Sequence, residues 1–251
     1  MTPNQDSAND DAILSAATKQ SDVAGEVRAS GVFIVSAPSG SGKTTLVGRL
    51  ISEVARLRFS VSYTTRSPRG SEQNGRDYYF VSRGEFETMI GRDELLEWAE
   101  VFGNYYGTAQ RFLIEARQRG DDLLLDIDVQ GAAKVRKRLP EAVSIFILPP
   151  SRVEMGARLR KRGQDSEEVI AKRLRDAQRE IKGVREYDYV LINDQLEQSA
   201  ASLRAIVQSE QNRLVGAGKV LLTKEICDLA ESCRTAGQYE RITPILDGFQ
   251  S

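Results

Sequence analysis

A glycine-rich segment near the start of the chain carries side chains suited to binding phosphate. Residues 37–44 read Ala-Pro-Ser-Gly-Ser-Gly-Lys-Thr, the pattern G-x-x-x-x-G-K-[ST] with Ala37 in place of the first glycine. In such a loop the glycines let backbone N–H groups point at phosphate oxygens, the lysine reaches the β- and γ-phosphates, and the threonine hydroxyl ligates Mg²⁺. The predicted ATP-binding residues of this segment are Ala37, Pro38, Ser39, Gly40, Ser41, Gly42, Lys43, Thr44 and Thr45.

The residues on either side of this loop predict the elements that must position it. A buried strand is expected over 31–36, where β-branched and aromatic side chains follow one another. A helix is expected after Thr44, because apolar residues from Leu46 to Val54 recur at helical spacing. The N-terminus of that helix would add its partial positive charge to the attraction for phosphate. A glycine-rich turn without a ligand is the alternative, but strand, loop and helix together favour a phosphate site.

The remainder of the chain alternates strand and helix patterns, which favours a parallel sheet. Strands are expected over 59–63, 78–81, 123–127, 143–148 and 189–192, and helices over 85–90, 131–138, 196–214 and, in two pieces broken around Gly163, 151–185. The segment 59–107 mixes both patterns and is predicted to be a small α/β insertion. The helix over 196–214 is expected to be the last.

Composition limits the available chemistry. With 40% hydrophobic residues, 28% charged residues and a net charge of −1, the chain is neither a disordered protein nor a strongly basic nucleic-acid packer. It contains no histidine, which excludes histidine general bases and Cys/His zinc sites. The two cysteines, Cys227 and Cys233, are too far apart for a C-x-x-C redox pair. Any catalysis must therefore use lysine, arginine, carboxylates or backbone groups.

Targeting signals are not evident in the sequence. No apolar run approaches the roughly 18 to 20 residues that cross a bilayer. Residues 1–30 lack the basic and apolar regions of a signal peptide. With only two cysteines besides, a cytoplasmic location is expected.

Further motifs follow the phosphate-binding loop in order. They read Phe-Ser-Val-Ser-Tyr-Thr-Thr-Arg-Ser-Pro-Arg-Gly over 59–70, Asn-Gly-Arg-Asp-Tyr over 74–78, Glu-Trp-Ala over 97–99, Gly-Asn-Tyr-Tyr-Gly-Thr over 103–108, Leu-Asp-Ile-Asp-Val-Gln-Gly over 125–131, Arg-Gly over 162–163 and Lys-Arg-Leu over 172–174. With them the chain resembles the guanylate kinases from about Gly31 to Leu214. The resemblance implies a P-loop NTPase core with a parallel sheet flanked by helices, a GMP-binding insertion and a helical lid. It also implies phosphoryl transfer from ATP to GMP, and to dGMP, with Mg²⁺.

The resemblance assigns the acceptor to a group of residues in the insertion. The GMP-binding residues it implies are Ser62, Arg66, Arg69, Tyr78, Glu97, Tyr106, Thr108 and, from the core, Asp128. Arginine forks and tyrosine hydroxyls suit a dianionic monophosphate. The Glu97 carboxylate can accept from N1–H and the 2-amino group of guanine, a pair of donors that adenine lacks. Taken alone, the two arginines could form a solvated basic turn, and Glu97 could be an exposed acid on a helix.

Two acids at a strand end are the candidate metal and acceptor ligands. Asp126 and Asp128 are two apart and so are expected on one face, where ligands bind in open α/β sheets. In the family's pattern such a pair serves Mg²⁺ and the acceptor nucleotide. We expect Thr44, with Asp126 acting through water, to hold the metal and Asp128 to contact GMP, although the pair could instead cap the next helix.

Arginines of the expected lid are the remaining candidates. Arg158 and Arg162 lie four apart on one predicted helix and Arg173 on the next. The resemblance implies that Lys43, Arg69, Arg162 and Arg173 are catalytic, and that Arg158, Asn193 and Asp194 contact ATP. Such cations neutralise the transferring phosphoryl group, whereas a closing lid excludes water. The neighbouring basic residues are expected to be ordinary surface residues: Arg160, Lys161, Arg175, Arg179 and Lys182.

The expected organisation is an extension over 1–30, core over 31–59, the GMP-binding subdomain over 60–110, core over 111–150, the lid over 151–168, core over 169–215 and a second extension over 216–251. Three other functions were weighed. They are a non-catalytic module that binds a protein segment, a kinase for another acceptor such as a phosphorylated sugar, and a nucleic-acid-dependent ATPase. The retained Lys43 and Arg173 argue against the first, Glu97 against the second, and the near-zero net charge against the third. Neither nucleic acid nor a membrane is expected as a partner.

Overall fold

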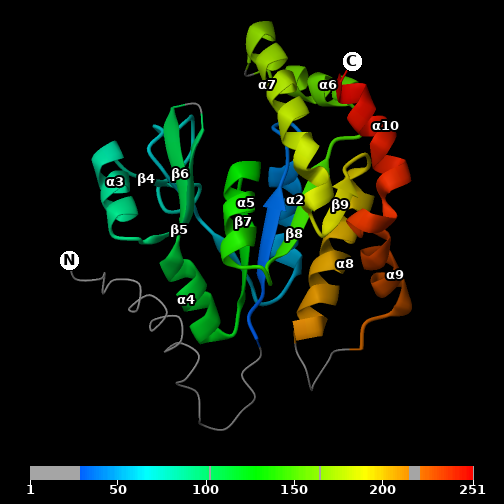
Figure 1. Ribbon diagram of the computed structural model, residues 1–251, viewed down its shortest axis with the longest axis horizontal. Coiled ribbons are helices and arrows are strands. Elements are labelled where there is room, and N and C mark those ends of the chain that lie inside the picture. Colours follow the sequence, from blue (N-terminus) through cyan, green and yellow to red (C-terminus); the bar gives the residue numbers. More distant parts are fainter. Residues whose placement is uncertain (1–28, 102, 164, 215–220, 251) are drawn as a thin grey trace, which may run out of the picture.

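The core of the protein is a parallel sheet. A computed structural model describes residues 29–101, 103–163, 165–214 and 221–250 (Figure 1). Five parallel strands pair in the order β2-β7-β1-β8-β9. They are β1 (Val32–Ser36), β2 (Leu57–Ser60), β7 (Asp122–Asp126), β8 (Val143–Leu148) and β9 (Tyr189–Ile192). The predicted α/β core with a parallel sheet is confirmed.

Helices cover both faces of this sheet because its central strands are buried on both sides. On β1, Phe33 and Val35 face one hydrophobic cluster while Val32 and Ile34 face the other, as the two-residue period of a strand requires. The first cluster includes side chains of α2 (Lys43–Glu53), α8 (Leu196–Leu214) and α9 (Lys224–Ser232). The second includes α4 (Gln110–Arg119), α5 (Val129–Arg138), α6 (Arg152–Arg162), α7 (Glu167–Glu180) and α10 (Tyr239–Gln250).

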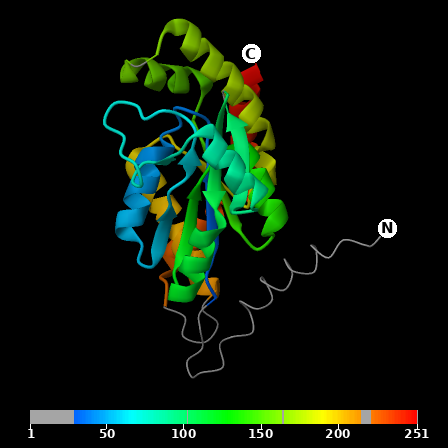
Figure 2. The ribbon, with the colours of Figure 1, turned by 90° about the vertical axis from the view of Figure 1, so that its left-hand side faces the viewer.

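The predicted insertion forms a second sheet beside the core. Its strands pair in the order β4-β3-β6-β5, and they are β3 (Tyr63–Thr64), β4 (Tyr79–Phe80), β5 (Leu95–Val101) and β6 (Asn104–Ala109). Helix α3 (Arg83–Gly91) begins with a capping box between Ser82 and Glu85 and buries Phe86. Figure 2 shows this unit in front of the core sheet, with α6 and α7 above it.

The expectation of one strand over 59–63 is wrong. Ser60 still pairs with Leu125 in the core sheet, whereas Tyr63 pairs with Gly107 in the second sheet. The chain therefore changes sheets between these residues. The alternating pattern continues across the change because each side of it is a partly buried strand, so periodicity alone could not reveal the break.

The helix over 196–214 is confirmed as α8, but it is not the last. Helix α9, a 3-10 turn (Thr235–Gly237) and α10 follow it. Between α9 and α10 the backbone lies along β9, the edge strand: Val190 N–H donates to Cys233 O at 2.9 Å, and Thr235 N–H to Asp188 O at 3.0 Å. An exposed strand edge can pair with other chains, and this segment covers part of it.

The C-terminal helix packs against α6, which lies within the predicted lid over 151–168, and against α7. Ile242 and Phe249 of α10 are fully buried in the cluster that contains Met155 of α6 and Ile170 of α7. In Figure 1, α10 runs beside α6 and α7. The two helices predicted around Gly163 are confirmed, since this glycine ends α6 with φ of 63°.

The two predicted extensions differ in what the structure describes of them. Residues 1–28 and Val220 lie outside the described residues. In the C-terminal extension, Leu221 is exposed, whereas Ile226 and Leu229 pack on the core. None of the helices among the described residues is both long enough and apolar enough to cross a membrane.

The packing of α10 predicts a large stability effect from its core contacts. Ile242→Ala removes a fully buried side chain and should lower the free energy of unfolding by about 2–5 kcal/mol. Leu221→Ala, at a side chain that is 97% exposed, is the matched control and should change it by less than about 0.5 kcal/mol. Chemical denaturation of the full chain measures both values. Equal stability of the two variants would contradict the packing of α10.

Candidate active site

The phosphate-binding loop joins β1 to α2 at the carboxyl edge of the core sheet. Gly40 and Gly42 have φ of 93° and 87°, values that strain any residue with a β-carbon. A β-carbon on Gly42 would also collide with the Asn193 side chain. Ala37 is not among the residues with positive φ, so its departure from the glycine pattern costs no backbone strain. The loop therefore has the shape that phosphate binding requires.

Asn193 holds this loop from the end of β9. Its Nδ2 donates to Ser41 O at 2.6 Å, and the side chain is only 4% exposed. Its own backbone N–H donates to Leu148 O at 2.8 Å, which fixes it to the neighbouring strand. The structure thus gives Asn193 a supporting contact to the loop, while Asp194 is exposed.

Lys43 lies at the start of α2 and forms an ion pair with Asp126, the last residue of β7. Burial by itself would lower the pKa of the Lys43 ammonium, but the Asp126 carboxylate, together with Tyr78 and Asp128, outweighs this and the pKa is raised. Asp128 lies beyond the strand rather than in it. It caps α5 by accepting from Gly131 N–H at 2.7 Å, so the alternative reading as a helix cap is correct for this residue. Both acids nevertheless face the same cleft.

Arg66 is held inside the insertion by a carboxylate that the sequence analysis missed. Its Nη1 and Nη2 each donate to Glu72 at 3.0 Å, and its Nε donates to the Tyr106 hydroxyl at 3.2 Å. Glu72 also accepts from the Arg69 backbone N–H at 2.8 Å. The hydrogen bonds from Arg66 lower the pKa of Glu72. At 11% exposed, the Arg66 side chain does not belong to a solvated turn.

Glu97 is a buried strand residue, which excludes the exposed helical acid considered above. It lies on β5 at 6% exposure and accepts a hydrogen bond from the Thr108 hydroxyl at 2.8 Å. Burial, with a smaller contribution from nearby Asp128, raises the pKa of the Glu97 carboxyl to about 7, while Thr108 and Lys134 act in the opposite direction. A buried acceptor of this kind can select a ligand by its hydrogen-bond donors.

These groups meet in one cleft of about 1100 Å³. The core contributes Lys43 and the two strand-end acids, and the insertion contributes Arg69 and Glu97. From α7, Arg173 closes the cleft beside the phosphate-binding loop. Its Nη1 donates to Ser39 Oγ at 2.6 Å and its Nη2 to Asp165 at 3.1 Å. The cleft is therefore lined by the phosphate-binding loop, by basic and aromatic residues of the insertion, and by Arg173 of α7.

Comparison with known proteins agrees with this arrangement. The family model for guanylate kinase matches residues 30–210. The chain belongs to the guanylate kinase family. It is 51% identical over 222 residues to guanylate kinase from Koribacter versatilis (strain Ellin345), which covers 87% of this chain and 95% of that protein. It is 52% identical over 181 residues to guanylate kinase from Dechloromonas aromatica (strain RCB), which covers 72% and 90%. The crystal structure of guanylate kinase from Anaplasma phagocytophilum aligns with a TM-score of 0.62 at 37% identity, covering 73% of this chain and 87% of that one.

Eleven of the twenty-three predicted site residues line the cleft. Those that line it are Ser39, Lys43, Thr44, Ser62, Arg69, Tyr78, Glu97, Tyr106, Asp126, Asp128 and Arg173. Arg66, Thr108 and Asn193 support lining residues or the loop through the hydrogen bonds given above.

A further nine expected residues are not among those that line the cleft. Five of them form the turn of the phosphate-binding loop itself: Ala37, Pro38, Gly40, Ser41 and Gly42. The other four lie outside that turn. Arg162 is exposed in the last turn of α6, and Thr45 and Asp194 are exposed as well. Arg158 pairs with Glu154 one turn earlier on the same helix, at 3.1 Å. The shared face of Arg158 and Arg162 was read from helical spacing, which does not reveal which way that face points.

Two acids of α7 line the cleft without having been expected. Asp176 and Glu180 follow Arg173 at steps of three and four residues, so they lie on the same face of the helix. Burial and then the charge of Asp128 raise the pKa of the Glu180 carboxyl to about 7. The helical spacing from Arg173 was a signal in the sequence that could have identified both.

The loop geometry predicts that Gly42 cannot be replaced. Gly42→Ala should weaken ATP binding at least about tenfold, because a positive φ costs a residue with a β-carbon roughly 1–2 kcal/mol before the collision with Asn193 is counted. Gly48→Ala, in the exposed middle of α2 with open space around it, is the control and should leave ATP binding unchanged. Calorimetric titration with a non-hydrolysable ATP analogue measures both. Wild-type affinity of the Gly42 variant would contradict the assigned loop geometry.

Proposed function

We propose that this chain transfers the γ-phosphoryl group of ATP to GMP in the cleft between the core and the insertion, giving ADP and GDP. The observation that carries the proposal is the joint lining of one cleft by Lys43 of the phosphate-binding loop, Arg69 of the insertion and Glu97 of β5. The first suits a triphosphate, the second a monophosphate and the third guanine. The curated relatives named guanylate kinase support the same reaction.

The acceptor site follows from the chemistry of its side chains. Arg69 and Arg66 offer guanidinium groups to the GMP phosphate, and the hydroxyls of Tyr78 and Tyr106 offer neutral donors. The ionised Glu97 carboxylate accepts from guanine N1–H and the 2-amino group. Adenine presents no such pair of donors and leaves this buried acceptor unpaired, which is a costly mismatch. Ser62 and Thr108 complete the base site, and dGMP shares every group that these residues address.

Phosphoryl transfer asks for positioning and charge neutralisation more than for covalent chemistry. Lys43 would reach the β- and γ-phosphates from the loop, and Arg173 lines the same cleft, where its guanidinium contacts Ser39 of that loop. The acceptor phosphate oxygen is ionised, so no general base is needed. Arg162 would have to move with the lid to reach the transferring group, and the same holds for Arg158 at the ATP site.

Magnesium fits the oxygen donors beside the loop. The Thr44 hydroxyl and the Asp126 carboxylate line the cleft within the same corner as Lys43. Among the described residues, no cluster of three or more acids, histidines or cysteines could hold a metal by itself. The ion would therefore depend on phosphate oxygens, with Thr44 as a ligand and Asp126 acting through water. When bound, it neutralises the charge that develops on the transferring phosphoryl group.

We propose that residues 60–110 bind the acceptor, that residues 151–168 form the lid, and that the core segments 31–59, 111–150 and 169–215 bind ATP. A cytoplasmic location is proposed because Cys227 and Cys233 are free thiols. Small-molecule nucleotides are the proposed partners, without nucleic acid or membrane.

A coupled assay of ADP release tests the proposed reaction directly. The full chain with ATP and Mg²⁺ is offered GMP, dGMP, AMP, UMP and CMP in parallel. Rapid turnover restricted to the two guanine nucleotides is expected. A folded, ATP-binding sample that is inactive with all five would instead favour the non-catalytic module or an acceptor outside the nucleotides.

Glu97 should make guanine selection depend on pH. Only the ionised carboxylate accepts both guanine donors, and its pKa is raised to about 7, so the preference for GMP over AMP should weaken as the pH falls through this value. Below that pH the carboxyl must release a proton on binding GMP, and the preference should fall by up to about tenfold per unit. Because the phosphates of GMP and AMP titrate alike, the ratio of kcat/KM values isolates the base site.

Glu97→Gln is the matching variant for this pH profile. It should lower the preference for GMP at neutral pH and remove its pH dependence, since the amide does not titrate in this range. An unaltered preference in this variant would move guanine recognition to another residue.

A further inference from the structure

Strand β5, which carries Glu97, has one strand neighbour among the described residues. It lies at the edge of the second sheet, where it pairs with β6. The pairing slips between Leu95, which faces Ala109, and Glu97, which faces Thr108, so Leu96 forms a bulge. A bulge re-aims the side chains that follow it and leaves nearby backbone groups without ladder partners. The direction of the Glu97 side chain is therefore set at an irregular and one-sided part of the sheet.

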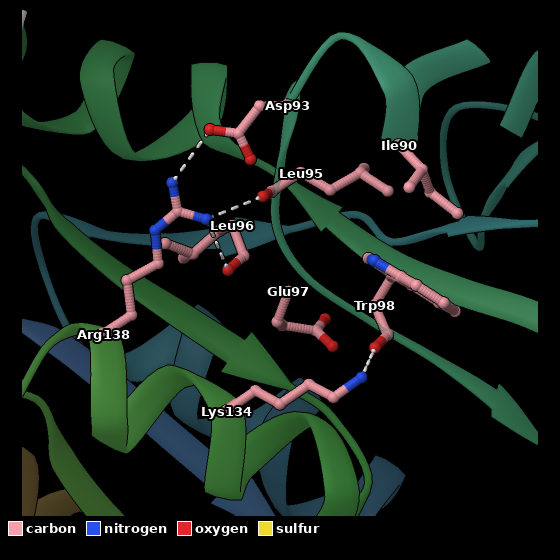
Figure 3. Close-up of a pocket in the computed structure, with 8 residues that line it drawn as sticks. All are labelled: Ile90, Asp93, Leu95, Leu96, Glu97, Trp98, Lys134 and Arg138. Atoms are coloured by element: carbon pink, nitrogen blue, oxygen red, sulfur yellow. Dashed lines mark hydrogen bonds and ion pairs between the residues drawn. The ribbon is translucent and has the colours of Figure 1, made fainter. Parts of the chain in front are cut away.

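Helix α5 of the core supplies partners for the backbone on both sides of Glu97. Arg138 Nη1 lies 3.2 Å from Leu95 O and 3.4 Å from Leu96 O, and its Nη2 lies 3.4 Å from the Asp93 carboxylate. Lys134 donates to Trp98 O, and its ammonium lies 4.7 Å from the centre of the Trp98 ring. Figure 3 shows the two cations reaching the strand on either side of Glu97.

The face of α5 that carries Lys134 and Arg138 also borders the Glu97 carboxylate itself. Gly131, Lys134 and Arg138 are spaced three and four residues apart, so they share one face of the helix. A β-carbon added to Gly131 would lie 2.7 Å from Glu97 Oε2. The glycine thus leaves room for the carboxylate, while the two cations hold the chain before and after it.

A second hollow lies behind Glu97. This cavity of about 340 Å³ is lined by Ile90, Asp93, Leu95, Leu96, Glu97, Trp98, Lys134 and Arg138. Glu97 therefore borders both this cavity and the substrate cleft. Close packing on the cavity side does not fix its position, so the backbone anchors carry more of that task.

We propose that Lys134 and Arg138 are positioning residues for guanine selection: from α5 they clamp β5 at Leu95, Leu96 and Trp98 and thereby hold Glu97 in place for the base. The proposal rests on the role of Glu97 proposed above. The positive charge of Lys134 also favours the ionised form of the Glu97 carboxyl, which is the form that accepts from guanine. Both cations would affect guanine binding through the position of β5, and both lie outside the phosphate-binding loop.

The test uses full-length variants in which methionine keeps the stem of each side chain and removes its donors. They are Lys134→Met, Arg138→Met and the double variant. Lys137→Met, an exposed basic residue in the last turn of the same helix, is the matched control for charge. Each is also made in a Glu97→Gln background. Steady-state kinetics give KM for GMP, KM for ATP and kcat, and thermal unfolding reports stability.

The double variant should raise KM for GMP about three- to tenfold, the range expected when one or two hydrogen bonds are lost, with KM for ATP unchanged. The Lys137 control should match the wild type. In the Glu97→Gln background the double variant should have little further effect, because the group being positioned is gone. Arg138→Lys, which keeps a positively charged donor group in place of the guanidinium, should show a smaller loss than Arg138→Met.

Two results would overturn the proposal. One is an unchanged KM for GMP in the folded double variant, and the other is a loss of the same size in the Glu97→Gln background, which would show a purely structural effect. Failure of the underlying role of Glu97 has a separate signature, because Glu97→Gln alone would then leave KM for GMP unaltered. Gly131→Ala gives an independent measurement: by displacing the Glu97 carboxylate it should raise KM for GMP without loss of thermal stability, and an unchanged KM would contradict positioning by α5.

Discussion

Parallel pairing of β1 with β7 and β8 is the constraint on which the rest of the site depends. It brings the carboxyl ends of three strands to one edge of the sheet, with Val35 beside Asp126 and Ser36 beside Phe146. The phosphate-binding loop leaves β1 at this edge. Lys43 and Asp126 therefore form an ion pair although they are far apart in the sequence. Pairing of β8 with β9 extends the same edge to Asn193, which supports the loop. The sheet thereby places one cation, one acid and one amide around the same backbone turn.

Three cations in or beside the cleft are paired with resident carboxylates. Lys43 pairs with Asp126, Arg66 with Glu72, and Arg173 with Asp165. Removing a cation from water without a partner is expensive, and these acids offset that cost while the phosphates are absent. When substrate binds, each cation would exchange its carboxylate partner for a phosphate, or contact both. Binding gains less from each ion pair than the bare Coulomb attraction would suggest, which leaves selectivity to groups such as Glu97 that have no such substitute.

The sequence predicted which residues form this site better than it predicted the contacts that hold them in position. The loop over 37–44, the parallel core and Glu97 could be identified because each depends on local spacing or on an ordered series of motifs. The change of sheet between Ser60 and Tyr63 could not, since both strands are partly buried and have the same period. Nor could the exposure of Arg162, because helical spacing defines a face and not its direction. The clamp on β5 is invisible for another reason: it joins side chains of α5 to backbone carbonyls more than thirty-five residues earlier in the chain.

The residues beyond the family match constrain any movement of α6. The match ends at residue 210, yet Ile242 and Phe249 are buried with Met155 and Leu159 of α6 and Ile170 of α7. Helix α10 is also tied to the core, because the segment just before it hydrogen-bonds to β9. Any movement that brings Arg162 toward the cleft must therefore slide α6 over α10 or carry α10 along. Packed cores resist continuous deformation, so such a movement favours two discrete arrangements over a gradual one.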